Sequence, residues 1–191
     1  RTGVPFVTTF HGAYSAGNFL KRIYNSVMAK GDRVIAISQF IAIHLHQTYG
    51  VPKNKLRIIP RGVDLDKFNV ASVSAERMGL LSAKWRLEEG LQVIMLPGRL
   101  TRWKGQINLI EAIGRLGRRD FRCLLVGGDQ GRVRYRRELE SLITRCGLDE
   151  VVRIVNHCDD MPAAYMLSDV VVSPSTDPEA FGRVMIEAQA F

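Results

Sequence analysis

The sequence predicts an α/β fold in which a parallel β-sheet is covered by helices on both faces. Short runs rich in β-branched residues alternate along the chain with stretches that carry apolar residues at helical spacing. The alternation is most regular over residues 92–190, where each short strand precedes a helix. Because a helix between two strands lets them run parallel in one sheet, both faces of that sheet need helices to cover them.

The first sixty residues are expected to supply three strands and two helices. The Ser38 hydroxyl can cap the second helix and Gly50 can end it, while Pro60 ends the third strand. The strands are expected at 4–10, 33–37 and 56–59, and the helices at 16–29 and from 38 to 46 or 49.

Residues 61–69 (RGVDLDKFN) contain turn-forming residues without periodicity, so we expect them to connect two parts of the chain. A helix at 74–86 follows, and then four strand–helix pairs. In the helix at 105–116 the apolar side chains of Ile107, Ile110, Ile113 and Leu116 are expected to share one face. The four strands are expected at 92–96, 122–126, 151–155 and 169–172, and their helices at 105–116, 133–146, 161–167 and 181–190.

The connector predicts two domains. Residues 1–60 would form the end of one α/β domain, and residues 61–191 most of another. The chain starts just before a buried-type strand and stops at Phe191 inside a helical pattern without a C-cap. A helix cut at that point leaves carbonyl groups unpaired. We therefore expect the sequence to be part of a larger protein.

The composition is that of an ordinary globular protein. Its 46% hydrophobic and 24% charged residues exclude wholesale disorder, and no apolar run reaches the ~18–20 residues of a transmembrane helix. Three cysteines cannot close a disulfide framework, and the N-terminus lacks a signal-peptide layout, so a cytoplasmic location is expected. The net charge of +8 predicts attraction to polyanions or phosphorylated molecules, although the arginines of 115–137 could equally form a solvated helix face.

A basic segment lies between the strand at 92–96 and the helix at 105–116. It reads GRLTRWKG over 98–105 and brings Arg99, Arg102 and Lys104 to a helix start. The helix dipole makes cations unfavourable there by about 0.3–1 kcal/mol, so three of them indicate an anion in their midst. A phosphate could accept hydrogen bonds from backbone N–H groups and from these side chains. The alternative is a solvated basic turn.

A second polar segment, SPSTDPEAFG over 173–182, precedes the last helix and contains Glu179, with Glu187 eight residues later. On a helix this spacing gives about 12 Å of rise. That exceeds the ~5–5.5 Å between the carboxyl groups of a retaining glycosidase, so we expect two separate roles. Glu187 lies among apolar residues and, facing a cleft, could accept two ribose hydroxyls. A solvated helix surface is the alternative.

The first strand ends in TTFHG, which places His11 where it could bond a substrate or move a proton near neutral pH. A structural role is the alternative. His44 and His46 have the wrong spacing for a helical metal pair, and HCDD (157–160) lacks a spaced partner, so no metal site is expected. No nucleotide-binding P-loop, dinucleotide fingerprint or nucleophile triad stands out.

Taken together, these segments closely resemble the retaining GT-B glycosyltransferases of group 1, which is family 4 of the glycosyltransferase classification. Many motifs in the family's order are more specific than any single one. The strongest are the Glu-x7-Glu signature, here Glu179 and Glu187, and G-R-x4-K-G. The matching stretches are TTFHG (8–12), VIAISQF (34–40), IIPRGVDLDKF (58–68), LPGRLTRWKG (96–105), LLVGGD (124–129), VNHCDDMPAAYMLSDVVVSPS (155–175) and PEAFGRVMIEA (178–188).

The resemblance implies two Rossmann-like domains and the transfer of a hexosyl group from a nucleotide-diphosphate sugar to a glycolipid or polysaccharide acceptor, with retention of anomeric configuration. In such families the leaving phosphate helps to deprotonate the acceptor. Neither a protein nucleophile nor a metal or other cofactor is therefore implied. Peripheral contact with an anionic membrane is compatible with the basic charge.

The resemblance also implies roles for single residues. Arg99 and Lys104 would clamp the donor diphosphate and stabilise its charge as it leaves. Glu179 would hold the donor sugar, and His11 would face the sugar that is transferred. The remaining donor contacts would come from Glu187 for the ribose, Gly98, Phe181 and Gly182 for the phosphate and sugar, and Asn156 and Cys158 for the base.

Two other functions stay open. A phosphorylase or nucleotide-sugar epimerase would share the architecture, although the Glu-x7-Glu segment argues against it. A basic nucleic-acid-binding module would explain the charge, but it should carry aromatic residues among the cations for base stacking, and only Tyr135 lies within 132–137. The sequence departs from the family in reading PRGVD over 60–64, where PNGVD is common.

Overall fold

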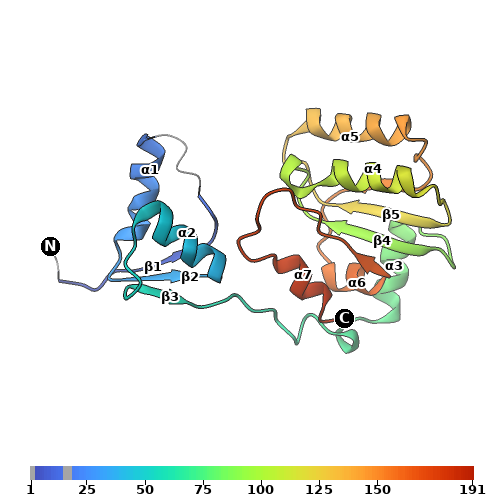
Figure 1. The fold of residues 1–191 in the computed structure, drawn as a ribbon. Helices are drawn as coiled ribbons and strands as arrows, with labels where there is room; N and C mark the ends of the chain where they lie inside the picture. The colour runs from blue at the N-terminus through green and yellow to red at the C-terminus, as the bar shows by residue number, and fades with distance from the viewer. Residues whose placement is uncertain (1–2, 15–18) are drawn as a thin grey trace. The chain divides into compact units, whose positions relative to one another are not determined.

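A computed structural model describes residues 3–14 and 19–191, and the chain divides into two compact units (Figure 1). Unit 1 comprises Arg1–Gly62 together with Glu179–Arg183, and unit 2 comprises Val63–Pro178 with Val184–Phe191. Each unit contains a parallel β-sheet with helices packed on it. The predicted α/β class is therefore confirmed.

Unit 1 is built on a three-stranded parallel sheet in the order β1-β2-β3. Its core is formed by buried side chains that include Phe10, Val34, Ile41 and Leu45. The predicted helix at 16–29 begins outside the described residues, and its remainder is divided into α1 and a 3₁₀ helix. The elements are β1 (Val7–Phe10), α1 (Phe19–Ser26), η1 (Met28–Lys30), β2 (Arg33–Ala36), α2 (Gln39–Tyr49) and β3 (Leu56–Ile58).

Helix α2 begins and ends where the sequence predicts. The Ser38 hydroxyl accepts a hydrogen bond from the Ile41 amide at 3.2 Å, and Gly50 ends the helix in the left-handed region with φ of 66°. The same hydroxyl donates to the Ala180 carbonyl oxygen at 2.6 Å, and Phe181 packs against the core of unit 1. The segment Glu179–Arg183 therefore belongs to unit 1, whereas a division of the sequence at residue 60 leaves it in the second domain.

Unit 2 contains a four-stranded parallel sheet in the order β6-β5-β4-β7. Every strand and helix that the sequence predicts between 74 and 190 is present, with bounds shifted by a few residues. The elements are η2 (Val70–Ser72), α3 (Ala75–Trp85), β4 (Gln92–Pro97), η3 (Arg102–Lys104), α4 (Gln106–Leu116), β5 (Phe121–Val126), α5 (Val133–Arg145), β6 (Val152–Val155), α6 (Met161–Met166), β7 (Val170–Val171) and α7 (Arg183–Ala188).

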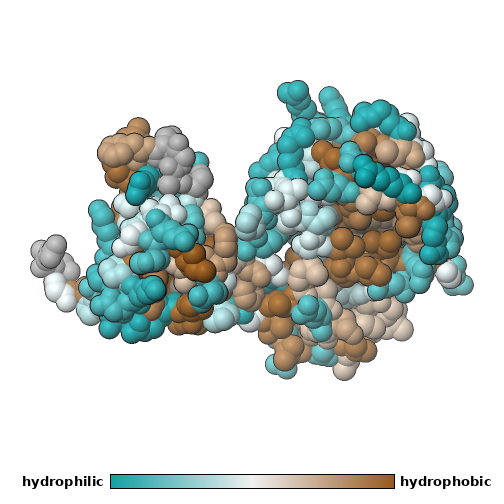
Figure 2. All heavy atoms as spheres, in the orientation of Figure 1, coloured by the Kyte–Doolittle hydropathy of each residue, from teal (hydrophilic) through white to brown (hydrophobic). Residues whose placement is uncertain are grey.

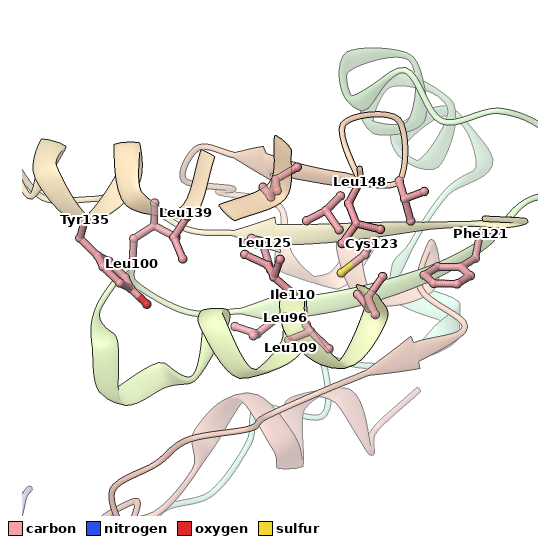
Figure 3. Packing of buried hydrophobic residues seen from close by; sticks show 14 residues of the cluster. Leu96, Leu100, Leu109, Ile110, Phe121, Cys123, Leu125, Tyr135, Leu139 and Leu148 are labelled. Carbon is pink, nitrogen blue, oxygen red and sulfur yellow. The ribbon is translucent and has the colours of Figure 1, made fainter. Parts of the chain in front are cut away.

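Helices cover both faces of the unit 2 sheet, in agreement with the burial of every residue of β5. Figure 1 shows α4 and α5 on one face and α3 and α6 on the other. Successive side chains of a strand point to opposite faces. Phe121, Cys123 and Leu125 accordingly pack under α4 and α5 (Figure 3), while Leu124 and Val126 pack with the helices of the other face.

Two helix predictions need correction. Helix α4 buries Gln106, Leu109, Ile110 and Ile113, which follow a 3.6-residue period, while Leu116 is 57% exposed at the last position before the left-handed Gly117. Leu116 is therefore outside the buried face. Helix α7 runs over Arg183–Ala188 instead of 181–190, because Gly182 before it has φ of +76°.

Three arginines of the stretch at 115–137 form ion pairs, and others, such as Arg119 and Arg134, are exposed. Arg118 pairs with Asp120 at 2.6 Å and Arg136 with Glu140 at 2.9 Å, while Arg122 is buried in β5 and bonds to Glu88. The surface over α5 is mostly hydrophilic (Figure 2). Among the helices of residues 3–14 and 19–191, none has both the length and the apolar character needed to cross a membrane.

Candidate active site

The basic segment (98–105) follows β4 in unit 2, at the carboxyl end of a central strand. The Gly98 amide donates to the Val126 carbonyl oxygen at 2.8 Å, which continues the pairing of β4 with β5 by one residue. The next residues leave the sheet, with Arg99 exposed and Lys104 half-buried at the end of η3. Gly105 then connects η3 to α4 with φ of 74°. Ligands of open α/β sheets bind at this edge.

The loop 173–176 after β7 is bonded to the basic segment. Strand β7 pairs with β4, and the Thr176 amide and hydroxyl donate to the Trp103 carbonyl oxygen at 2.8 and 3.3 Å. A Cβ atom on Gly105 would lie 2.0 Å from the Pro174 carbonyl oxygen, so only glycine allows this approach. The two segments that the sequence assigns to one sheet edge are thus in contact within unit 2.

Buried hydrogen bonds from the start of α4 hold the backbone of the basic segment in place. The Gln106 side chain is fully buried; its amide nitrogen donates to the Arg99 carbonyl oxygen at 2.9 Å, and its oxygen accepts from the Tyr135 hydroxyl at 3.1 Å. Helix α5 is thereby connected through α4 to the backbone that carries Arg99. Sequence reasoning missed both residues. The sequence does contain one indication of these hydrogen bonds, because Gln106 is a polar residue at the first position of the otherwise apolar buried face of α4.

The three cations of the basic segment have different surroundings. Arg102 makes two hydrogen bonds to Glu138, at 2.9 and 2.5 Å, and its guanidinium lies 5.3 Å from the centre of the Tyr135 ring. Its charge is therefore balanced within the protein. The Lys104 ammonium lies 4.4 Å from the centre of the Trp103 ring, and Arg99 extends from the exposed surface of the segment.

Glu187 is a buried carboxylate. It lies on α7 with 6% of its surface exposed, and its Oε2 accepts a hydrogen bond from the Tyr165 hydroxyl at 3.0 Å. The alternative of a solvated helix surface is therefore wrong. Burial of a carboxylate costs free energy unless hydrogen bonds satisfy it, so this position is a built polar site inside unit 2.

The loop 156–158, predicted to border the base, exposes the side chains of Asn156 and His157 and buries that of Cys158. The Asn156 side-chain oxygen accepts from Arg136 at 3.0 Å, and the Cys158 side chain packs in the core with Met95. Burial raises the pKa of the Cys158 thiol above its usual value, so the neutral thiol is favoured. Cys158 can offer only backbone groups to a ligand.

An ion pair holds the end of this loop. Arg77 on α3 donates to both carboxylate oxygens of Asp160, at 2.8 and 2.5 Å, and Asp160 accepts from the Ala163 amide as the N-cap of α6. The hydrogen bond from Arg77 lowers the pKa of Asp160, which keeps that carboxylate ionised. The loop is thereby fixed to the start of α6.

Unit 1 contains the remaining predicted site residues. They are His11 after β1 and Glu179, Phe181 and Gly182, of which Phe181 packs against the core of the unit. The Arg61 guanidinium lies 2.8 Å from His11 Nδ1. Because a guanidinium can only donate, Nδ1 must be the acceptor, and the neutral ring carries its proton on Nε2.

Glu179 and Glu187 do not share a helix, since α7 begins at Arg183. The described residues contain no group of three or more potential metal ligands.

Two family matches cover most of the chain. Residues 80–191 match the family described as glycosyl transferases group 1, and residues 1–67 match glycosyltransferase family 4. Among curated proteins, the D-inositol 3-phosphate glycosyltransferase of Xylanimonas cellulosilytica is 32% identical over 213 aligned residues, which cover all of this chain and 49% of that protein. The chain thus spans about half the length of the curated relatives it matches.

Solved structures agree with these matches. A glycosyltransferase from Rickettsia africae has 38% identity and a TM-score of 0.86, covering 96% of this chain and 48% of that one. Anabaena Alr3699/HepE, solved in complex with UDP-glucose, has 29% identity and a TM-score of 0.85, covering 97% and 51%. The chain therefore belongs to the group 1 family of glycosyltransferases and has the GT-B type of fold.

Proposed function

We propose that the protein transfers a hexosyl group from a nucleotide-diphosphate sugar to an acceptor, with retention of anomeric configuration. The observation that carries the proposal lies within unit 2. There, a basic segment with Arg99 and Lys104 is bonded to the β7 loop at the ligand-binding edge of a parallel sheet, and the same unit holds the buried carboxylate of Glu187. The Anabaena protein, which binds UDP-glucose, supports a uridine diphosphate sugar as the first donor to test.

The diphosphate is assigned to the basic segment. Gly98 opens the turn, and the side chains of Arg99 and Lys104 carry the charge that a diphosphate needs. Glu187 is assigned to the ribose, because a carboxylate can accept hydrogen bonds from two neighbouring hydroxyls. The backbone of Asn156 and Cys158 is assigned to the base, in agreement with the burial of the Cys158 side chain.

In the proposed reaction the bond from the sugar C1 to the phosphate oxygen breaks, and a bond from C1 to the acceptor oxygen forms on the same face. The acceptor proton passes to the leaving diphosphate. Negative charge builds on that diphosphate in the transition state, so Arg99 and Lys104 accelerate the reaction electrostatically. Glu179, His11 and the backbone of Phe181 and Gly182 are assigned to the donor sugar and phosphate. The proposal includes neither a protein nucleophile nor a metal cofactor.

The acceptor is proposed to be a hydroxyl of a glycolipid or polysaccharide. The names of the curated relatives support an inositol phosphate as a second candidate acceptor. The cysteines among the described residues are free, in agreement with the proposed cytoplasmic location. Peripheral contact with an anionic membrane is part of the same proposal.

Calorimetric titration with UDP, GDP and ADP tests the donor site. We expect one nucleotide to bind selectively, and the Glu187→Ala variant to bind it more weakly by about 1–3 kcal/mol, the scale of a lost hydrogen bond to a charged group. The matched control is Glu111→Ala, which removes an exposed carboxylate of α4. Equal affinity in the Glu187→Ala and wild-type proteins, or no binding by the wild type, would contradict the proposal.

The stereochemistry of transfer has its own test. Proton NMR of the first product formed from an α-linked nucleotide sugar is expected to show an α-linkage. A β-linked first product would mean inversion, and would rule out the same-face mechanism while leaving the donor site intact.

A further inference from the structure

A buried hydrogen bond joins Tyr165 on α6 to Glu187 on α7. Tyr165 is 3% exposed and Glu187 is 6% exposed, so bulk water does not compete for the phenol or for Oε2. A tyrosine hydroxyl that donates to a carboxylate is a charge-assisted hydrogen bond, which is shorter and stronger than a neutral one. The 3.0 Å distance is at the long end of the range for hydrogen bonds between two oxygen atoms.

The position of the Tyr165 hydroxyl is itself determined by packing. The Tyr165 ring lies 6.1 Å from the ring of Phe68 and 6.0 Å from that of Phe191, measured between centroids. Its helix, α6, is capped by Asp160, which Arg77 holds through two hydrogen bonds. The ring of Tyr165 is therefore held by its packing, and its hydroxyl is a fixed donor for the Glu187 carboxylate.

Orientation matters for the role assigned to Glu187. A glutamate side chain has three rotatable torsions, so an unrestrained carboxylate loses conformational entropy when it binds two hydroxyls at once. A group that the protein already holds in the binding geometry loses less conformational entropy on binding. A hydrogen bond to one carboxylate oxygen reduces that freedom, because it favours the side-chain conformations that place Oε2 next to the phenol.

We infer that Tyr165 is a positioning residue for the ribose: it does not touch the nucleotide, and acts by orienting the Glu187 carboxylate that accepts the ribose hydroxyls. This inference rests on the proposed function. It adds a residue of α6 to the donor site, and it makes recognition of the ribose depend on the connector through Phe68 and on α3 through Arg77. If Tyr165 only filled space in the core, removing its hydroxyl would leave recognition of the ribose unchanged.

The test compares two ligands in the same protein. The affinities of the intact wild-type protein and of Tyr165→Phe for UDP and for 2′,3′-dideoxy-UDP are measured by calorimetry. We expect Tyr165→Phe to weaken UDP binding about tenfold, since one hydrogen bond to a charged group is lost. Binding of the dideoxy nucleotide is expected to stay within about twofold, because it has no hydroxyls for Glu187 to accept. In a Glu187→Ala background, Tyr165→Phe should cause no further loss for UDP.

The contrasting variant is Tyr135→Phe, which removes the buried hydroxyl that bonds to Gln106 beneath the basic segment. It should weaken both nucleotides equally, because its effect is on the diphosphate. Equal losses for both nucleotides in Tyr165→Phe would overturn the inference, since they would show a packing role alone. If UDP binds but Glu187→Ala does not distinguish the two nucleotides, the ribose assignment fails, and the inference fails with it. If the wild type binds no nucleotide, the proposed function itself is wrong.

Discussion

Replacing Lys104 with alanine is expected to lower kcat of sugar transfer by about 10²–10³, and Arg99→Ala is expected to act in the same direction. The magnitude is that of removing one donor aimed at charge that develops in a transition state. Because the leaving diphosphate gains charge only as the C1–O bond breaks, kcat should fall by a larger factor than KM rises. Steady-state kinetics with varied donor concentration separate the two quantities.

Arg102→Ala is the matched control for this prediction. It removes a cation from the same segment, but one whose charge Glu138 already balances through two hydrogen bonds. The expected result is a change in kcat of less than about tenfold and a loss of stability of at most about 1 kcal/mol, because the ion pair is exposed. If Arg102→Ala were as damaging to kcat as Lys104→Ala, the general positive charge of the segment would be responsible, and the specific diphosphate clamp would be refuted.

Gly105→Ala is expected to destabilise unit 2 by about 2–5 kcal/mol, a large part of the roughly 5–15 kcal/mol that holds a domain together. Two costs add at this position. The backbone φ of 74° strains any residue with a Cβ, and that Cβ would lie 2.0 Å from the Pro174 carbonyl oxygen. The clash is with backbone, so the β7 loop must move away from the basic segment. Denaturant unfolding measures the loss in free energy.

Gly117→Ala separates the two costs. Gly117 follows the other end of α4 with φ of 71°, but a Cβ there would meet no atom within 4 Å. The strain of a positive φ alone is expected to cost about 1 kcal/mol. Equal destabilisation by the two variants would show that contact between the basic segment and the β7 loop contributes nothing to stability.

Much of the fold could be predicted from the sequence, because it depends on local patterns. The alternation of short apolar strands and amphipathic helices predicts the parallel sheets, and local chemistry sets the bounds of α2, where Ser38 and Gly50 lie at its ends. The predicted positions of Arg99 and Lys104 follow for the same reason, since they occupy a strand-to-helix turn that can be recognised from the segment alone.

The polar contacts that support the site could not be predicted, because each joins residues far apart in the chain. Gln106 bonds to Tyr135 on a different helix, and Tyr165 reaches Glu187 on another. The number of cations in the basic segment does not reveal that the charge of Arg102 is balanced within the protein, because its partner Glu138 lies 36 residues away. The face of α4 was misjudged at Leu116 because the pattern of apolar residues does not reveal where the helix ends relative to the core.

A crystal structure of the intact protein with bound UDP tests the central claim most directly. The claim is that Arg99 and Lys104 bind the donor diphosphate and that Glu187 binds its ribose. The predicted result is a diphosphate within hydrogen-bonding distance of the Lys104 ammonium and the Arg99 guanidinium, with ribose hydroxyls donating to the Glu187 carboxylate, which still accepts from Tyr165. A nucleotide that binds without touching Glu187 or the basic segment would contradict it.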